Sequence, residues 1–383
     1  MPKEKKESYI EKIPSEEDDY YSEDPYEIPS WGADLSFREL ITMYEEGELL
    51  KPEIQRNYVW DKSEASRFIE SLLLGLPIPS IFLAKKKDSK LIVDGFQRIM
   101  TVYDFVKGVF SKDDSVFKLS NTEKINVVWR GKTFNQLSEG EQRRILSSTI
   151  HSIVFMDKKS KEKSSGGVLY QVFERINTGG RTLTPQEIRN CVYQGEFNRL
   201  LISLNENPLW RDLYGQEKKD PRMNDIEFIL RFFALGDKEL LDRKVTQISL
   251  KKELNDYMGN LEVEKEEVLK RLKKNFQQTI RFIHKKIGSN AFHNFLKDKE
   301  GNFKGDGSLS EKFHPTVFDA ISIATKIVLE RNKNIKVSNL EKKRLNLLKD
   351  SSFVEYSSIR TTNIENIRGR ISLALKYLYG ENL

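Results

Sequence analysis

The chain has 383 residues, of which 38% are hydrophobic and 32% are charged. This balance is typical of a globular protein with two or three packed units. No apolar run approaches the length of a membrane span, and the N-terminus holds no apolar signal region, so we expect neither feature. Cys191 is the only cysteine, which excludes an intrachain disulfide and favours a cytoplasmic location.

Charge is distributed unevenly along the chain. The first 30 residues hold ten Asp or Glu against four Lys and carry −6, whereas the remainder carries +12 to give the net +6. A basic body favours partners that carry phosphate. We expect residues 1–33 to form an acidic, flexible head, which acts either as a solubility segment or as a mimic that covers a basic groove.

The front of the chain, residues 34–165, predicts a mixed unit of helices and strands. Ser36 begins an amphipathic helix, and Ser63 caps a second helix that Gly75 closes. The other elements expected here are strands at 80–87, 90–95 and 148–158, a helix at 96–109 and a hairpin at 126–138.

Beyond residue 165 the apolar spacing is helical almost to the end of the chain. Lysine-rich amphipathic helices are expected at 260–288 and 338–349, with a loop at 298–313 between them. The sequence therefore predicts an α+β protein, in which a mixed domain over residues 34–165 precedes a helical domain over residues 166–383.

The strongest local signal is KLIVDGFQRIMTVYDF. A strand ends at Asp94, Gly95 makes a turn, and a helix carries Gln97 and Arg98 in its first turn. The free N–H groups of a helix N-terminus bind phosphate, and an arginine adds a planar pair of donors. An aspartate at the end of a strand is suited to hold Mg²⁺ or to orient a water. This combination fits the hydrolysis of a phosphoanhydride or a phosphodiester.

A purely structural explanation of the same residues stays open. Asp94 and Gln97 have the spacing of a capping box, in which both side chains only satisfy the end of the helix. The pentapeptide D-G-x-Q-R is also too short to be specific by itself.

Four sequence blocks follow one another in a family-like order. They are IQRNYVWD, which contains Gln55 and Arg56, the Asp94 block, VFERINTGGRTLTPQEIRNCVYQGEF and RMNDIEFILRFFAL. In order and spacing they resemble the N-terminal domain of GmrSD-type restriction enzymes, which is related to the ParB and sulfiredoxin-like fold. The resemblance covers roughly residues 35–235.

The resemblance implies that the front domain binds and hydrolyses a nucleoside triphosphate, with Mg²⁺ or Mn²⁺, in defence against foreign DNA. Carried over by motif, the catalytic residues are Asp94, Gln97 and Arg98, and Asp94 is the metal ligand. The implied nucleotide-binding residues are Gln55, Arg56, Gly95, Arg98, Glu174, Arg175 and Asn177. Phe96 departs from the family pattern, which has two glutamines after the glycine. We expect this loss of an amide to weaken hydrolysis more than nucleotide contact.

The block FERINTGGRTLTPQE predicts a joint between two helices. Thr184, with Pro185 and Glu187 behind it, has the pattern of a capping box at the start of the second helix. The alternative is that Glu174, Arg175, Asn177 and Arg181 converge on the Asp94 site from the helical side, which the family pattern favours.

The C-terminal third offers candidate contacts for a DNA backbone at Arg360, Arg368 and Arg370, although a solvated helix face explains each of them equally well. The four histidines lack the spacing of a metal site. We therefore expect a stand-alone family member without an HNH nuclease module, which contacts DNA and works with a separate nuclease subunit. The alternatives are a non-enzymatic, nucleotide-gated regulator that binds nucleic acid, and a DNA-nicking nuclease.

Overall fold

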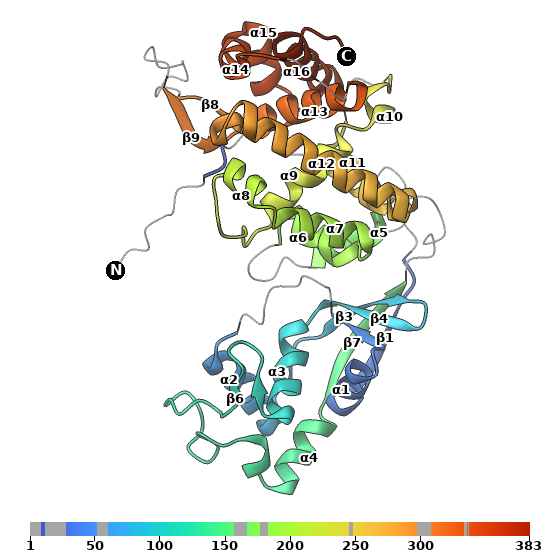
Figure 1. Cartoon of the computed structure of the whole chain (residues 1–383). Helices are drawn as coiled ribbons and strands as arrows, with labels where there is room; N and C mark the ends of the chain where they lie inside the picture. The colour runs from blue at the N-terminus through green and yellow to red at the C-terminus, as the bar shows by residue number, and fades with distance from the viewer. Residues whose placement is uncertain are drawn as a thin grey trace. The chain divides into compact units, whose positions relative to one another are not determined.

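The structure is a computed structural model that describes residues 9–11, 28–51, 60–156, 167–176, 183–244, 248–296, 308–332, 335 and 337–383. The chain forms two compact units (Figure 1). The sheet unit comprises residues 24–194, and the helical unit comprises residues 195–383 together with residues 1–23.

The sheet unit is built on a five-stranded mixed sheet in the order β1-β7-β3-β4-β2. The strands are β1 (Ser30–Ser36), β2 (Leu49–Leu50), β3 (Ile81–Lys86), β4 (Ser89–Asp94) and β7 (Thr149–Met156). β7 runs antiparallel to β1 and parallel to β3, while β4 runs antiparallel to β3 and parallel to β2. A separate short pair joins β5 (Val109–Phe110) to β6 (Ser115–Val116). The three strands expected from the sequence are confirmed.

Helices cover both faces of this sheet. They are α1 (Phe37–Glu45), α2 (Lys62–Leu74), α3 (Phe96–Lys107), α4 (Glu139–Ser147), α5 (Gly167–Ile176) and α6 (Pro185–Val192). Leu83 and Ile92 belong to a buried cluster with α1 to α4, whereas Leu91 and Val93 belong to a second cluster with α5 and α6. This alternation follows from the twofold period of a strand, and it buries the sheet on both sides.

The sheet unit extends beyond residue 165, where the sequence predicts the end of the mixed domain, because α5 and α6 also pack on the sheet. Phe173 and Ile188 are buried in the cluster that covers the second sheet face, so the chain leaves the sheet unit only after Gln194. At the other end, residues 30–33 of the expected flexible head form part of strand β1.

The cap expected for α2 is wrong. Asp61, and not Ser63, is the N-cap. A carboxylate oxygen of Asp61 accepts a hydrogen bond from the backbone N–H of Glu64, and the carboxylate of Glu64 accepts one from the backbone N–H of Asp61. Ser36, where the sequence predicts the start of a helix, is the N-cap of α1 in a capping box, and the capping box expected at Thr184 is confirmed for α6.

The hairpin expected at 126–138 is also wrong, since this stretch forms turns and a 3-10 helix at Phe134–Gln136. The side chain of Asn126 accepts from the backbone N–H of Val128, and that of Gln136 accepts from the N–H of Thr133. Such local bonds compete with strand pairing for the same N–H groups.

The helical unit is formed by α7 (Glu196–Asn205), α8 (Pro208–Tyr214), α9 (Asn224–Ala234), α10 (Lys238–Leu241), α11 (Leu250–Gly259), α12 (Glu266–Lys286), α13 (Pro315–Arg331), α14 (Leu340–Lys349), α15 (Ser351–Ser358) and α16 (Ile364–Ala374). One antiparallel pair, β8 (His293–Phe295) with β9 (Leu309–Phe313), places a strand within the expected loop at 298–313. The sequence-based α+β class, with a sheet domain before a mostly helical region, is confirmed.

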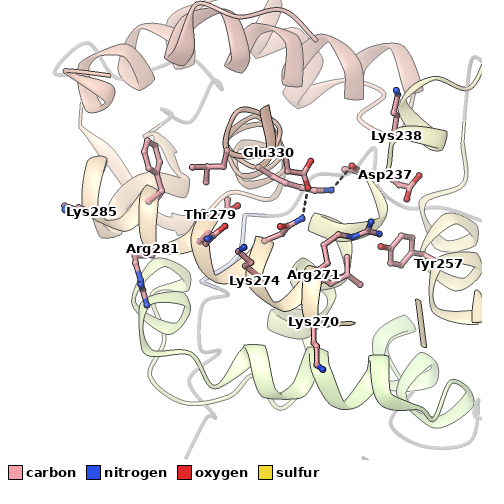
Figure 2. Close-up of a pocket in the computed structure, with 17 residues that line it drawn as sticks. Asp237, Lys238, Tyr257, Lys270, Arg271, Lys274, Thr279, Arg281, Lys285 and Glu330 are labelled. Atoms are coloured by element: carbon pink, nitrogen blue, oxygen red, sulfur yellow. Dashed lines mark hydrogen bonds between the residues drawn. The ribbon is translucent and has the colours of Figure 1, made fainter. Parts of the chain in front are cut away.

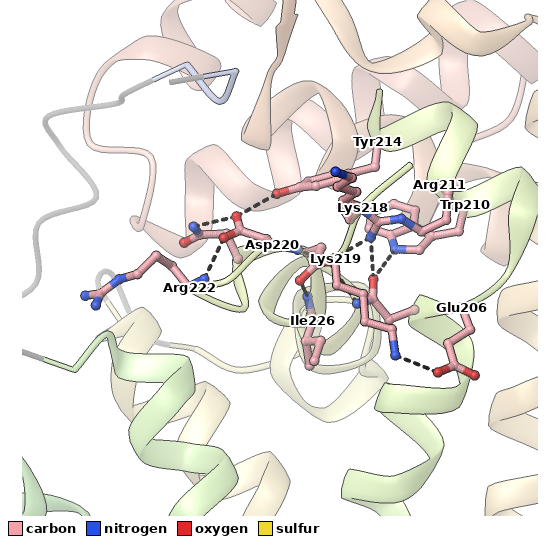
Figure 3. A network of polar contacts seen from close by, with 12 residues as sticks. Glu206, Trp210, Arg211, Tyr214, Lys218, Lys219, Asp220, Arg222 and Ile226 are labelled. Carbon is pink, nitrogen blue, oxygen red and sulfur yellow. Dashed lines mark hydrogen bonds and ion pairs between the residues drawn. The ribbon is translucent and has the colours of Figure 1, made fainter. Parts of the chain in front are cut away.

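A buried polar network fixes the chain between α8 and α9 (Figure 3). The carboxylate of Asp225 accepts hydrogen bonds from Nη1 of Arg211 at 2.7 Å and from the backbone N–H of Asp220 at 2.9 Å. Asp220 accepts from the hydroxyls of Tyr214 and Tyr9, at 3.2 and 2.8 Å. Because Asp225 is fully buried, this network stabilises the fold. The RMNDIEFILRFFAL block thus has a structural reason for Asp225.

Among the residues that the structure describes, none of the helices combines the length and the apolar character needed to cross a lipid bilayer.

Candidate functional site

The candidate site lies where β4 passes into α3. Asp94 is the last residue of β4, and α3 starts at Phe96. Gly95, between them, has a φ of +98°, and a Cβ atom on it would lie 2.2 Å from Cγ2 of Ile81. Only glycine therefore allows the strand to turn into the helix while its backbone passes this close to β3.

Arg98, in the first turn of α3, joins two strand ends. Its Nη2 atom donates to Oδ2 of Asp94 at 2.5 Å and to the carbonyl oxygen of Ser80, just before β3, at 3.1 Å. The side chain of Asp94 is 40% exposed and that of Arg98 is 16% exposed. The carboxylate therefore faces solvent, while the guanidinium is mostly enclosed. The sequence pattern does not predict the hydrogen bond from Arg98 to Ser80, because its acceptor is a backbone carbonyl 18 residues away.

Asp94 does not cap α3. Gly95 occupies the N-cap position, and no side chain makes a capping hydrogen bond at this helix end. The side-chain oxygen of Gln97 instead accepts from the backbone N–H of Trp60 at 3.3 Å. The capping-box explanation of Asp94 and Gln97 is therefore wrong, and within the described residues the N-terminus of α3 has no side-chain cap.

Two polar atoms at this site lack partners within the described part of the chain. The Nε atom of Arg98 is buried and makes no hydrogen bond, and Oδ1 of Asp94 accepts none, since the bond from Arg98 goes to Oδ2. The Nε atoms of Arg211 and Arg344 are also buried without a hydrogen bond, so the Nε atom of Arg98 indicates a ligand only together with the open carboxylate oxygen beside it. A carboxylate oxygen is the ligand that Mg²⁺ prefers. The pair suits a phosphate with its metal ion.

Gln55 and Arg56, expected to complete the nucleotide site, lie outside the described residues. The described chain on either side of them lies beside β4 and α3. Leu50 pairs with Leu91 in a parallel ladder, so the chain leaves β2 in the direction of the end of β4. It returns at Trp60, which is hydrogen-bonded to Gln97.

The joint between α5 and α6 belongs to the same unit as Asp94. Phe173 on α5 shares a buried cluster with Val93, the neighbour of Asp94 on β4. Glu174 is half-buried and Arg175 is exposed, and neither makes a hydrogen bond or an ion pair with Asp94. Asn177 and Arg181 lie outside the described residues. The structure therefore brings together Asp94, Gly95, Gln97 and Arg98, and adds Glu174 and Arg175 only as neighbours on the second face of the sheet.

Two of the three arginines expected to contact DNA are structural. Arg370 is 1% exposed, donates to Asp319 at 3.0 Å and to the carbonyl oxygen of Thr361 at 2.7 Å, and cannot reach a DNA backbone from there. Arg368 donates to the carbonyl oxygens of Leu241 and Arg243. Both guanidinium groups donate to acceptors within the helical unit because charged groups inside a fold need partners. Arg360 alone is exposed.

No group of three or more His, Cys, Asp or Glu suited to hold a metal occurs in the part of the chain that the structure describes. His151 pairs with Asp34 at 2.8 Å, and His284 pairs with Asp212 at 2.6 Å. Cys191 is buried against the sheet, and burial raises the pKa of its thiol to about 12. Cys191 therefore has a packing role in this cluster.

These features define an α+β domain whose sheet is covered by helices on both faces. It carries an aspartate and an arginine where a strand passes through a glycine into a helix. Residues 37–194 match the model of the family described as GmrSD restriction endonuclease, N-terminal domain, so this part of the chain is similar to that domain. The match ends at Gln194, where the sheet unit ends. The chain matches no curated protein and no solved structure. The family indicates a component of a restriction system that acts against phage.

Proposed function

We propose that this protein is the nucleotide-handling component of a restriction system. The Asp94 site binds a nucleoside triphosphate with Mg²⁺ or Mn²⁺ and hydrolyses it. The helical unit contacts DNA, and a separate nuclease subunit carries out cleavage.

The unpaired Nε atom of Arg98 is the observation that supports nucleotide binding most directly. A phosphate group supplies the acceptor that this enclosed N–H lacks, and it also suits the uncapped N-terminus of α3. Oδ1 of Asp94, open beside it, is the atom that would hold the metal ion. A bound metal ion neutralises charge on the phosphates, which lowers the barrier to attack by water.

Gln97 and Gly95 act on the geometry of this site. Gly95 allows the close turn that aims the start of α3 at the strand end. Gln97 holds Trp60, at which the chain returns from Gln55 and Arg56. We therefore assign Gln97 a positioning role toward that segment, in addition to the catalytic role that the family resemblance implies.

Phe96 supports a second candidate function, a nucleotide-gated regulator that binds but does not hydrolyse. Its side chain packs against the apolar cluster of α1 to α4, so it offers no polar group to the site. A DNA-nicking activity has less support. Asp94 is the one carboxylate at the turn within the described residues, whereas cleavage by two metal ions needs several carboxylates in one place.

Calorimetry with each of the four nucleoside triphosphates and Mg²⁺ tests the binding step. Arg98→Ala removes a charge-assisted contact worth roughly 1.5–3 kcal/mol, so we expect affinity to fall by about tenfold or more. Arg67→Ala, at an exposed arginine on α2 of the same unit, is the matched control and should bind like the unaltered protein. Equal affinity of the two variants would remove Arg98 from the nucleotide site.

A further inference from the structure

The helical unit contains a cavity of about 1190 Å³ between α12, α13 and the start of α10 (Figure 2). Seven cationic and two acidic side chains line it. Five of the cations come from α12, namely Lys270, Arg271, Lys274, Arg281 and Lys285. The cavity is thus strongly positive, with most of its charge on one helix.

Both acidic side chains already have partners. Oε1 of Glu330 accepts a hydrogen bond from the side chain of Asn275 at 2.6 Å. Asp237 caps α10 by accepting from the backbone N–H of Glu239 at 2.8 Å. These neutral donors leave both carboxylates charged, so the seven cations and two carboxylates give the lining a net charge of +5.

Four of the five α12 cations that line the cavity have no acidic partner. Arg271, Lys274, Arg281 and Lys285 are exposed and make no ion pair with any residue that the structure describes, whereas Lys270 pairs with Glu266. After Glu267 the helix contains no further acidic residue. Like charges one turn apart on a helix destabilise it, so this series has a cost that a bound anion would offset.

The cavity also presents a polar group without a partner. The hydroxyl of Thr279, on α12, is buried and makes no hydrogen bond within the described chain, and the residue is 1% exposed. Lys326 on α13 lines the cavity as well, is 9% exposed, and donates to the carbonyl oxygen of Gly236 at 2.9 Å. A hydroxyl and an ammonium group at the enclosed side suit an oxygen-rich anion.

The positive surface continues beyond the cavity. A smaller hollow of about 320 Å³ is lined by Lys270, Lys273, Lys274 and Arg281, and it shares three of these cations with the main cavity. From Lys270 to Lys285 the helix extends ~22 Å, at ~1.5 Å per residue. A compact nucleotide would occupy one hollow, whereas two joined hollows fit an extended polyanion. At ~3.4 Å per phosphate along one strand, this length covers about six phosphates.

We propose that this cavity and the adjoining hollow bind the sugar–phosphate backbone of a nucleic acid strand. This inference rests on the DNA contact in the proposed function, and it names α12 as the surface that makes the contact. The contact is with phosphate, so it is independent of base sequence and sensitive to salt.

Fluorescence anisotropy with the full chain tests this inference, using labelled single-stranded DNA, duplex DNA and single-stranded RNA of equal length. The double variant Lys274→Gln/Arg281→Gln removes two exposed charges on α12. The control Lys342→Gln/Lys349→Gln removes two exposed lysines on α14 of the same unit. Circular dichroism melts establish that both variants fold like the unaltered chain.

We expect the α12 variant to bind the preferred strand about tenfold more weakly and to lower the slope of log K against log salt by about 2, since each lost phosphate contact contributes ~0.9 on duplex DNA. The control should change affinity by less than about twofold. Equal behaviour of the two variants would overturn the inference, as would no binding of any strand by the unaltered protein.

Calorimetry with nucleoside triphosphates separates this inference from the proposed nucleotide site. We expect the α12 variant to retain the affinity for the triphosphate that the unaltered chain shows. Loss of triphosphate binding in the α12 variant, with strand binding unchanged, would make the cavity a site for a compact ligand and would contradict the inference. Strand binding through α12 in a chain that binds no triphosphate would support the inference and reject the nucleotide site.

Discussion

The guanidinium of Arg98 on α3 and the carboxylate of Asp94 at the end of β4 form an ion pair, with 2.5 Å between Nη2 and Oδ2. This ion pair leaves the other carboxylate oxygen open to solvent and one N–H of the guanidinium enclosed without a partner in the described chain. A residue that only capped α3 would bond the helix backbone, and Asp94 does not. The pair therefore has the features of a ligand site.

Gly95→Ala should destabilise the sheet unit more than the same change at Gly75. Both glycines have positive φ, which costs an alanine about 1–2 kcal/mol. Only at Gly95 would the new Cβ meet a neighbour, Cγ2 of Ile81 at 2.2 Å, whereas nothing lies within 4 Å at Gly75. We expect an additional loss of about 1–3 kcal/mol from this overlap. Urea denaturation of both variants measures the difference, and equal free energies of unfolding would show that the turn does not need its close approach to β3.

Asp94→Asn should separate metal dependence from folding. Asparagine keeps the size of the side chain but loses the charge that holds a divalent cation, and an ion pair this exposed contributes only roughly 0.2–1 kcal/mol to stability. We expect EDTA to weaken triphosphate binding by the unaltered protein and to leave binding by the variant unchanged. Titrations with and without Mg²⁺ provide the comparison. A variant that responds to EDTA as the unaltered protein does would place the metal elsewhere.

Arg370→Gln should lower the free energy of unfolding by about 3–5 kcal/mol, because it removes one member of a buried charge cluster. Asp319 receives hydrogen bonds from both Arg231 and Arg370, and all three residues are at most 2% exposed. Arg360→Gln, at an exposed position, should change stability by about 0.5 kcal/mol or less. Thermal and urea melts of the two variants test this. A stable Arg370→Gln protein with weakened DNA binding would restore Arg370 as a DNA contact.

Cys191 should react with a thiol reagent only when the sheet unit opens. Burial raises the pKa of this thiol to about 12, so at pH 8 the reactive thiolate is scarce, and the side chain is also 1% exposed. We expect one thiol per chain to react quickly in denaturant and none over the same period in native buffer. A thiol that reacts in native buffer as fast as it does in denaturant would show that α6 does not hold Cys191 against the sheet.

The elements that could be predicted from the sequence are those whose pattern lies within a short stretch of consecutive residues. Strands β3 and β4, the turn at Gly95 and the helix behind it each follow from apolar alternation and one glycine. Strand β1 could not be predicted in this way. It is an edge strand with mostly exposed side chains, Trp31 at 42% among them, so it lacks the apolar alternation that would reveal it.

The same distinction between local and distant sequence signals applies to the candidate site residues. Asp94 and Arg98 lie four residues apart, and the sequence alone is enough to place them together. The partner of Arg370 is Asp319, 51 residues away, so a buried arginine and an exposed one cannot be told apart from the local pattern. The cavity beside α12 likewise depends on α13 and the start of α10, and the sequence shows only that α12 is rich in lysine.

Release of inorganic phosphate from each of the four nucleoside triphosphates, with Mg²⁺ and with or without DNA, tests the nucleotide site most directly. We expect the unaltered chain to hydrolyse at least one of them, and Asp94→Asn to reduce kcat by roughly 10²-fold while it still binds that triphosphate. Full activity of Asp94→Asn, or no release from any triphosphate under either condition, would contradict hydrolysis at Asp94.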